Sequence, residues 1–329
     1  MAELAIAERW GELRERGWLR ADAFESRTAE LAAVRAVATD GLGAGRIFDG
    51  HRNGLERLLV AEDDGIDTRT RSLLAAGELA VGVWGADPGP DDGLAATLDR
   101  TSQSITGVKV FSSGAGLLDL AIVLVRRTHD GPPTLPVLVD LGAPGAVHVD
   151  EAWFRAPALR ESHSHRVVFD AAPVVGFLGE EGSFTADPWI SGDALRSAAV
   201  WAGAADTLLA RMRSIAGRPG DGERLGRAAA ICTGADAWLA AGAVAVDAAH
   251  AGDRASAWPV IAALRLELTE RLRELMRLAA EHVGSRGLAT DDVLREARDG
   301  LDLLLLQHRL GPVAERLGAH AAEQAAAAR

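Results

Sequence analysis

Three residue types are scarce or missing in this chain of 329 residues. Tyrosine is absent, and cysteine and lysine each occur once, as Cys232 and Lys109. A single cysteine excludes an intrachain disulfide, a zinc site built on several thiolates and a CxxC redox pair. The residues around Lys109 read Gly-Val-Lys-Val, which does not match GxxxxGK[ST] and excludes a Walker phosphate loop. Schiff-base chemistry would have to rest on Lys109, and no phenol is present to serve as an acid.

Basic charge is also in short supply, because 47 acidic residues outnumber 35 basic ones and the formal net charge is −12. Nucleic acids and anionic membrane surfaces are bound through basic patches, so we expect neither as a partner. Residues Met1 to Leu4 lack the basic and apolar regions of a signal peptide. No uncharged apolar run has the length of about 18 residues that a membrane span needs. We therefore expect a cytoplasmic protein.

The length and the patterns along the chain predict an α+β multidomain protein. Residues 1–78 show helical periodicity and predict a short N-terminal helical domain. Its expected helices are 4–13, 26–38, 54–60 and 68–76. The glycines at 41, 43 and 45 do not form the GxGxxG pattern of a dinucleotide-binding loop and do not follow a strand. They are interpreted as a helix break.

Residues 79–187 change to short apolar runs separated by Gly, Pro and Asp clusters, which is typical of β-strands joined by turns. The expected strands are 79–84, 105–111, 120–125, 136–141, 146–149 and 166–169. Strands at this spacing, with no helix between them, predict a central antiparallel β-barrel or sandwich.

Residues 188–329 return to long helical patterns. The expected helices are 192–216, 221–249, 255–283 and 290–318. Their lengths and short connections predict a C-terminal four-helix bundle.

Four segments, taken in order, resemble the acyl-CoA dehydrogenase superfamily of flavoproteins. Residues 81–89 read VGVWGADPG and resemble the first flavin-contacting strand and turn. Residues 105–115 read ITGVKVFSSGA and resemble the segment G-x-K-x-(W/F)-x-(S/T)-x-G, and residues 163–174, HSHRVVFDAAPV, resemble the strand that closes the β-domain. Residues 280–287 read AEHVGSRG and, with the Arg-Asp pair at 298–299, resemble the region of the last two helices.

The resemblance implies a bound flavin: FAD, or FMN in one branch of the superfamily. It places the Ser113 hydroxyl, with Ser112 beside it, at the flavin N5 atom and lays Phe111 over one face of the ring. The pyrimidine edge would meet residues Trp84, Gly85 and Ala86. The alternative from local sequence is that Phe111 is a core residue and that Ser112 to Gly114 form an ordinary turn.

The bundle contributes to the cofactor site in a different way. In the superfamily, a glycine turn between the last two helices contacts the FAD of a neighbouring subunit. Gly284 and Gly287 match that turn, so the resemblance implies a homodimer or homotetramer. Gly284 is equally well explained as a glycine that ends a helix. Two departures are that Glu281 replaces the expected glutamine and that no Arg-x-x-Phe-Gly segment is found.

The preferred hypothesis for the reaction is the oxidation of a CH–CH bond in an acyl thioester, with an acyl or acyl-CoA substrate and electron-transfer flavoprotein as a possible partner. Such an enzyme needs a carboxylate base whose pKa is tuned by desolvation. The commonest position for that base in the superfamily holds Gln307, and a second position holds Asp193. Asp193 is also explained as an aspartate favoured by the N-terminal end of a helix.

Two other functions stay open. Some superfamily members are two-component monooxygenases, which receive reduced flavin from a flavin reductase; Ser113, His308 and His51 look similar to their hydroxyl and histidines. A flavin-free scaffold or regulatory subunit is the third hypothesis. His163 and His165 would share one face of a strand, but no third ligand lies near them in the sequence, so we expect no metal site.

Overall fold

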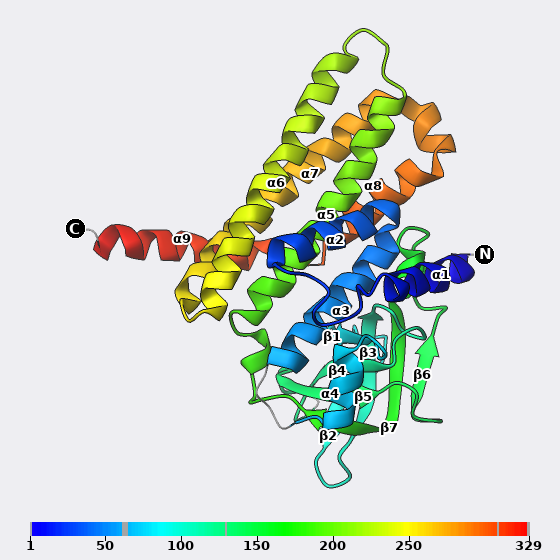
Figure 1. The fold of residues 1–329 in the computed structure, drawn as a ribbon, viewed down its shortest axis with the longest axis vertical. Helices are drawn as coiled ribbons and strands as arrows, with labels where there is room; N and C mark the ends of the chain where they lie inside the picture. The colour runs from blue at the N-terminus through cyan, green and yellow to red at the C-terminus, as the bar shows by residue number, and fades with distance from the viewer. Residues whose placement is uncertain (1, 61–64, 129, 308, 328–329) are drawn as a thin grey trace. The chain divides into compact units, whose positions relative to one another are not determined.

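The structure is a computed structural model that describes residues 2–60, 65–128, 130–307 and 309–327 (Figure 1). By its internal contacts the chain divides into two compact units. The β unit contains residues 1–25 and 43–190, and the bundle unit contains residues 26–42 and 191–329. The division of the sequence at residues 78 and 187 stays a prediction.

The β unit is built on a seven-stranded sheet with the order β1-β4-β5-β7-β3-β2, in which β6 pairs with β7. The strands are β1 Val81–Trp84, β2 Thr97–Asp99, β3 Ser104–Ser112, β4 Leu120–Val125, β5 Leu135–Asp140, β6 Val147–Asp150 and β7 His165–Phe177. The expectation of a purely antiparallel sheet is wrong at one pair, because β1 runs parallel to β4. The long connection through β2 and β3 makes this possible, since parallel pairing needs a crossover and not a tight turn.

Strand β4 is buried on both faces, as its continuous apolar sequence predicts. Ala121 and Val123 belong to a core shared with β3, β5 and β7. Ile122 and Leu124 belong to a second core, which includes Leu74 of α4 (Thr68–Ala75) and side chains of α3 (Leu42–Val60). One face of β4 therefore packs against helices α3 and α4, and the other face packs against residues of β3, β5 and β7.

The interpretation of glycines 43 and 45 as a helix break is wrong, because both lie inside α3. Only Gly41 ends a helix, as the C-cap of α2 (Arg27–Asp40). A Cβ atom on Gly43 would lie 2.6 Å from the backbone nitrogen of Ser162, which ends the short 3₁₀ helix η1 (Arg160–Ser162). Gly43 therefore permits close contact between α3 and η1. Helix α1 (Ala2–Glu15) contacts η1 as well.

The bundle unit contains α5 Trp189–Ser214, α6 Asp221–His250, α7 Arg254–Thr290, α8 Asp292–Leu305 and α9 Leu310–Ala327. The last predicted helix, 290–318, is therefore wrong as a single element, because α8 ends at Leu305 and α9 begins at Leu310. Helix α7 continues to Thr290, beyond the predicted end at 283, through a kink at Gly284 where φ is 71°.

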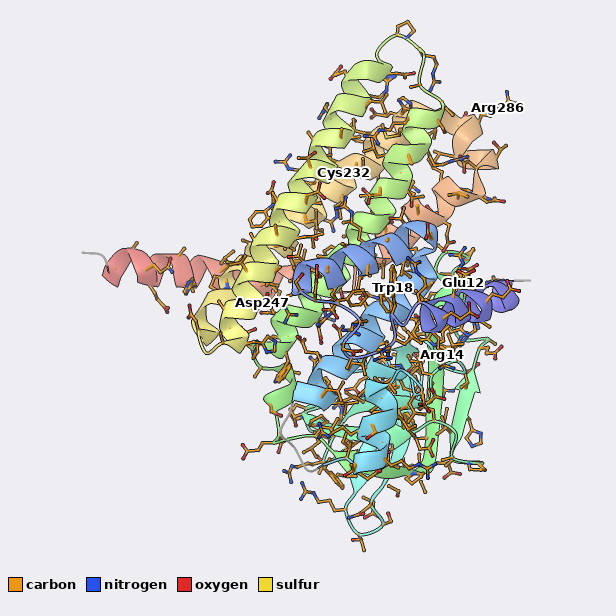
Figure 2. All side chains as sticks on the ribbon, viewed as in Figure 1. Glu12, Arg14, Trp18, Cys232, Asp247 and Arg286 are labelled. Carbon is orange, nitrogen blue, oxygen red and sulfur yellow. The ribbon has the colours of Figure 1, made fainter. Side chains whose placement is uncertain are left out.

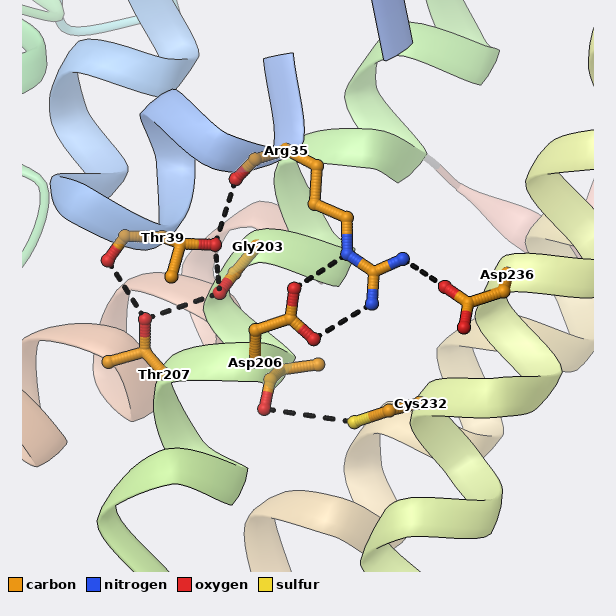
Figure 3. A network of polar contacts seen from close by, with 8 residues as sticks. Arg35, Thr39, Gly203, Asp206, Thr207, Cys232 and Asp236 are labelled. Carbon is orange, nitrogen blue, oxygen red and sulfur yellow. Dashed lines mark hydrogen bonds and ion pairs between the residues drawn. The ribbon is translucent and has the colours of Figure 1, made fainter. Parts of the chain in front are cut away.

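Helix α2 belongs to the bundle unit, although the sequence places it in an N-terminal helical domain. Figure 3 shows the reason: the Arg35 guanidinium binds Asp206 of α5, with N–O distances of 2.6 and 2.8 Å, and also binds Asp236 of α6. Thr207 donates a hydrogen bond of 3.1 Å to the Thr39 carbonyl. A Cβ on Gly203 would lie 2.6 Å from the Arg35 carbonyl oxygen, so glycine allows α2 to approach α5.

By length and composition alone, α6 could cross a membrane, and 44% of its most apolar window is buried inside the protein. Cys232 lies on this helix (Figure 2), and its thiol donates a long contact of 3.9 Å to the Ala205 carbonyl. Burial raises the pKa of the Cys232 thiol to about 11. The thiol is therefore protonated near neutral pH and behaves as a small core side chain.

Candidate functional site

Phe111 stands at the end of β3 in a backbone conformation that phenylalanine rarely adopts, with φ at 50°. The residue is 51% exposed, and its ring meets Trp153 edge to face, with 4.9 Å between ring centroids. Trp153 is itself held by a 2.7 Å hydrogen bond from its indole nitrogen to Asp92. An exposed aromatic ring on a strained backbone is a feature that clusters at ligand sites.

Ser113 lies two residues further on, and its hydroxyl joins a buried chain of serines. The Ser113 and Ser164 hydroxyl oxygens are 2.9 Å apart, and those of Ser164 and Ser162 are 2.7 Å apart. Ser162 donates a 2.6 Å hydrogen bond to the Leu159 carbonyl. The structure thus brings together two segments that are about 50 residues apart in sequence.

Residues 84–86 lie against the same end of β3. The Trp84 side chain is buried in the sheet core, and its indole nitrogen donates a 3.0 Å hydrogen bond to the Ser113 carbonyl. The Ala86 carbonyl accepts a 3.2 Å hydrogen bond from the Val110 backbone nitrogen. The Trp84 ring has a structural role here, and only the backbone and the exposed Ala86 are accessible for ligand contact.

A cluster of charged side chains around the buried Lys109 supports this turn. Lys109 is fully buried; its ammonium lies 2.6 Å from Asp87 and donates a 3.2 Å hydrogen bond to the Gly85 carbonyl. Arg126 binds the second Asp87 oxygen at 2.7 Å. Burial lowers the pKa of Lys109, while the Asp87 carboxylate opposes that shift. The single lysine of the chain is thus committed to holding the turn after β1.

His51 is fully buried in α3, and both of its ring nitrogens contact backbone groups. Nδ1 accepts a 3.2 Å hydrogen bond from the Val81 nitrogen, so Nε2 carries the proton and donates to the Leu19 carbonyl at 3.0 Å. Burial lowers the pKa of His51 to about 4. In this structure His51 joins α3 to β1 as a neutral structural residue, which leaves neither nitrogen for a reacting group.

The other candidates lie elsewhere. Asp193 is half-buried in the second turn of α5, and Gly284 forms the kink of α7, where a Cβ atom would meet open space. Gly287 lies in the helical turn that follows, and Glu281 before the kink pairs with Arg277 at 2.5 Å. All of these residues belong to the bundle unit. His308 lies outside the described residues.

The residues around Phe111 and Ser113 fit a flavin by three observations. Phe111 is half-exposed, so its ring can stack against a planar apolar ring, and two residues further on Ser113 carries a hydroxyl on a residue that is 8% exposed. The Ser112 hydroxyl is fully buried, and no partner for it is found among the described residues. Gly114 has a φ of 80°, and a Cβ atom at this position would lie 2.6 Å from the Leu118 side chain. The turn therefore packs closely against its neighbours.

Sequence reasoning missed Ser162, Ser164 and Trp153 as parts of this site. Ser164 lies within the motif HSH and was interpreted only as part of a strand, while Trp153 gave no signal at all. His163 and His165 have ring centroids 5.3 Å apart. Within the described part of the chain, no group of three metal-ligating side chains is found.

A cavity of about 540 Å³ lies in the bundle unit and is separate from these residues. Its lining comes from α2, α5 and α6 and includes Leu31, Arg35, Asp206 and Leu239. The Arg35 ion pairs described above lie in its wall. None of the residues expected to bind flavin lines this cavity, so the cavity is not part of the candidate site.

No protein-family model matches the sequence, and the search of curated proteins finds no match. Solved structures do match. KijD3, solved with FMN and a dTDP-linked amino-keto sugar, is 17% identical with a TM-score of 0.76, covering 96% of this chain and 86% of that one.

FMN-bound TdsC from Paenibacillus sp. A11-2, a dibenzothiophene monooxygenase, is 18% identical with a TM-score of 0.69, covering 93% and 85%. PigA, solved with FAD and proline, is 16% identical with a TM-score of 0.71, covering 96% and 89%. These are acyl-CoA dehydrogenase-like proteins, so the predicted resemblance is confirmed at the level of the fold.

Proposed function

We propose that this protein is a flavin-dependent oxidoreductase that binds the flavin ring at Phe111 and Ser113. The observation that carries the proposal is the half-exposed Phe111 ring, held at φ 50° two residues before a buried hydroxyl chain. The shared fold supports it, since KijD3 and TdsC were solved with FMN and PigA with FAD. Either flavin satisfies the proposal, because the ring system is common to both.

Each residue has a distinct part in the proposed site. The Phe111 ring covers one face of the flavin and excludes water from it, while Trp153 holds the Phe111 ring in place. The Ser113 hydroxyl bonds to the ring edge at N5, and backbone groups of residues 85 and 86 meet the polar edge. A bound flavin supplies two-electron transfer and, when reduced, reaction with oxygen.

For the reaction, we propose monooxygenation with reduced flavin delivered by a reductase. Residue 307, where a dehydrogenase base is commonest, is an exposed glutamine and cannot take a proton. TdsC, which shares the fold, is a monooxygenase. KijD3 was solved with a nucleotide sugar and TdsC with indole, so we expect a small organic substrate. The homodimer or homotetramer implied by Gly284 and Gly287 remains part of the proposal.

Desaturation of an acyl thioester is the second candidate, and it depends on Asp193. This carboxylate is half-buried in α5, so part of it stays open to meet a substrate. Its test is anaerobic bleaching of bound flavin by acyl-CoA compounds. Asp193→Asn should abolish that bleaching and leave flavin bound; persistent bleaching would remove Asp193 as the base.

Flavin binding is tested by titrating the protein with FMN and with FAD and following flavin fluorescence. Phe111→Ala should weaken binding by about fivefold, because one stacking face contributes on the order of 1 kcal/mol beyond its buried area. Phe177→Ala is the matched control, since Phe177 is an exposed phenylalanine on β7 of the same unit. Equal affinity in the two variants, or no binding by the wild type, contradicts the proposed site.

The reaction is tested by mixing the protein with enzymatically reduced FMN and ¹⁸O₂ in the presence of small aromatic or sulfur-containing compounds. A monooxygenase yields a product that carries one oxygen atom from ¹⁸O₂, which mass spectrometry detects. Bleaching by acyl-CoA without oxygen incorporation would favour desaturation. A protein that binds neither flavin would be the scaffold or regulatory subunit.

A further inference from the structure

The direction of each hydrogen bond in the serine chain follows from its chemistry. A carbonyl oxygen only accepts, so the Ser162 hydroxyl gives its one proton to Leu159 across 2.6 Å. Ser162 must then accept from Ser164 across 2.7 Å. Because the Ser164 hydroxyl donates its proton to Ser162, it must accept a hydrogen bond from Ser113 across 2.9 Å. The Ser113 proton therefore points into the protein, and its lone pairs are left for a ligand.

We propose that Ser164 and Ser162 are positioning residues that hold the Ser113 hydroxyl as a hydrogen-bond acceptor and thereby make the site prefer reduced flavin. This inference rests on the proposed function, which places the flavin N5 atom at Ser113. In reduced flavin N5 carries a hydrogen and donates, whereas in oxidised flavin N5 only accepts. An accepting Ser113 therefore matches the reduced form.

Oxidised flavin would require the whole chain to reverse. Ser113 would donate to N5, Ser164 to Ser113 and Ser162 to Ser164. The hydrogen bond from the Ser162 hydroxyl to the Leu159 carbonyl would then be lost, and that carbonyl would keep the 2.9 Å hydrogen bond from the Ser162 backbone nitrogen. The hydroxyl groups lie on residues that are at most 8% exposed, so water cannot readily replace that bond. A lost buried hydrogen bond changes an equilibrium by about fivefold.

The segment around Ser162, at the end of the serine series farthest from the ligand, is held in place by its backbone, and this fixes the direction in which the hydroxyl groups donate. Leu159 and His163, which flank η1, both have positive φ, at 61° and 46°. The Ser162 carbonyl accepts a 2.9 Å hydrogen bond from the Gly114 nitrogen, which ties η1 to the turn that carries Ser113. Gly43 of α3 packs against the Ser162 backbone nitrogen. The anchor and the ligand-facing hydroxyl thus belong to one connected structure.

The experiment compares the dissociation constants of oxidised FMN and of dithionite-reduced FMN, measured anaerobically with the full chain. In Ser164→Ala, Ser113 is free to donate to oxidised flavin, so the preference for the reduced form should fall by about fivefold. For a two-electron couple this equals a potential of the bound flavin lower by about 20 mV. Ser162→Ala should act in the same direction, although it lies two hydroxyl groups further from the ligand.

The ratio of the two dissociation constants separates positioning from a merely structural role, because general loosening of the site weakens both forms alike. Ser164→Thr, which keeps the hydroxyl, should restore the ratio. Ser183→Ala is the control. Ser183 also donates to a backbone carbonyl in the same unit, but it does not belong to the hydrogen-bonded series Ser113, Ser164 and Ser162. Binding with an unchanged ratio in both alanine variants overturns the inference. Failure of the wild type to bind either form overturns the proposed function instead.

Discussion

Replacing Gly43 by alanine should destabilise the protein, because the new methyl group has no room. The Cβ atom would lie 2.6 Å from the Ser162 nitrogen and 2.7 Å from the Glu161 carbonyl carbon. Both neighbours are backbone atoms, which cannot move aside as the end of a flexible side chain does. Overpacking of this kind costs about 1–3 kcal/mol of unfolding free energy.

Gly50 supplies the matched control, because it lies in the same helix, α3. Its Cβ would meet only the Arg46 guanidinium, at 3.9 Å. Gly50→Ala should therefore stabilise the protein by about 0.5–1 kcal/mol, since alanine loses less backbone entropy in a helix than glycine does. The two substitutions add the same atoms to one helix, and the structure predicts opposite signs.

Urea unfolding followed by circular dichroism measures both effects, and thermal unfolding supplies a second estimate. A change of 1 kcal/mol shifts the melting temperature by about 1–2 °C in a chain of this length, because the unfolding entropy grows with the number of residues. Gly43→Ala should melt below the wild type and Gly50→Ala above it. If Gly43→Ala is as stable as Gly50→Ala, the close contact between α3 and η1 does not exist, and the support it gives to Ser162 is lost with it.

Two further predictions concern buried charged and titratable groups. Glu30→Ala should cost about 3–5 kcal/mol, because it removes the carboxylate that binds the buried Arg196 at 3.0 Å; Glu267→Ala, at an exposed ion pair, should leave the urea midpoint almost unchanged. The pKa of His51 is about 4 in the fold and 6.5 as a free side chain, so the unfolded chain binds more protons between these values. Stability should fall as the pH drops from 6.5 to 4, by about 3 kcal/mol at pH 4, and a pH series of unfolding free energies should lose this component in His51→Gln.

Local patterns in the sequence were sufficient to locate most helices and strands. The spacing of Ile6, Trp10 and Leu13 predicts a helix, and all three are buried in α1. The helix expected at 26–38 is α2, and Ser26 caps it, because the Ser26 hydroxyl accepts a hydrogen bond from the Ala29 nitrogen. The unbroken apolar run of β4 indicated a strand, and both of its faces are buried. These predictions succeed because periodicity reports which side of an element is shielded from water.

The same patterns do not identify the partner that shields each side. The strand that pairs with β1 is β4, not a sequence neighbour, and the predicted antiparallel arrangement failed there. Helix α2 looks like a member of an N-terminal domain, but Arg35 binds Asp206, 171 residues away. The glycines of α3 look like a helix break until their neighbours in space are known.

The sequence by itself located most of the elements and excluded an intrachain disulfide, a CxxC pair and a Walker loop. Its resemblance to a flavoprotein superfamily gave Ser113 and Phe111 as the residues to examine. Only the tertiary structure decided that Phe111 stands half-exposed beside Trp153, that both His51 nitrogens are occupied, and that the Ser113 hydroxyl meets Ser164. The physical reason is that helix and strand formation depend on residues a few positions apart. The direction of a hydroxyl proton depends instead on a buried carbonyl 46 residues along the chain, at Leu159.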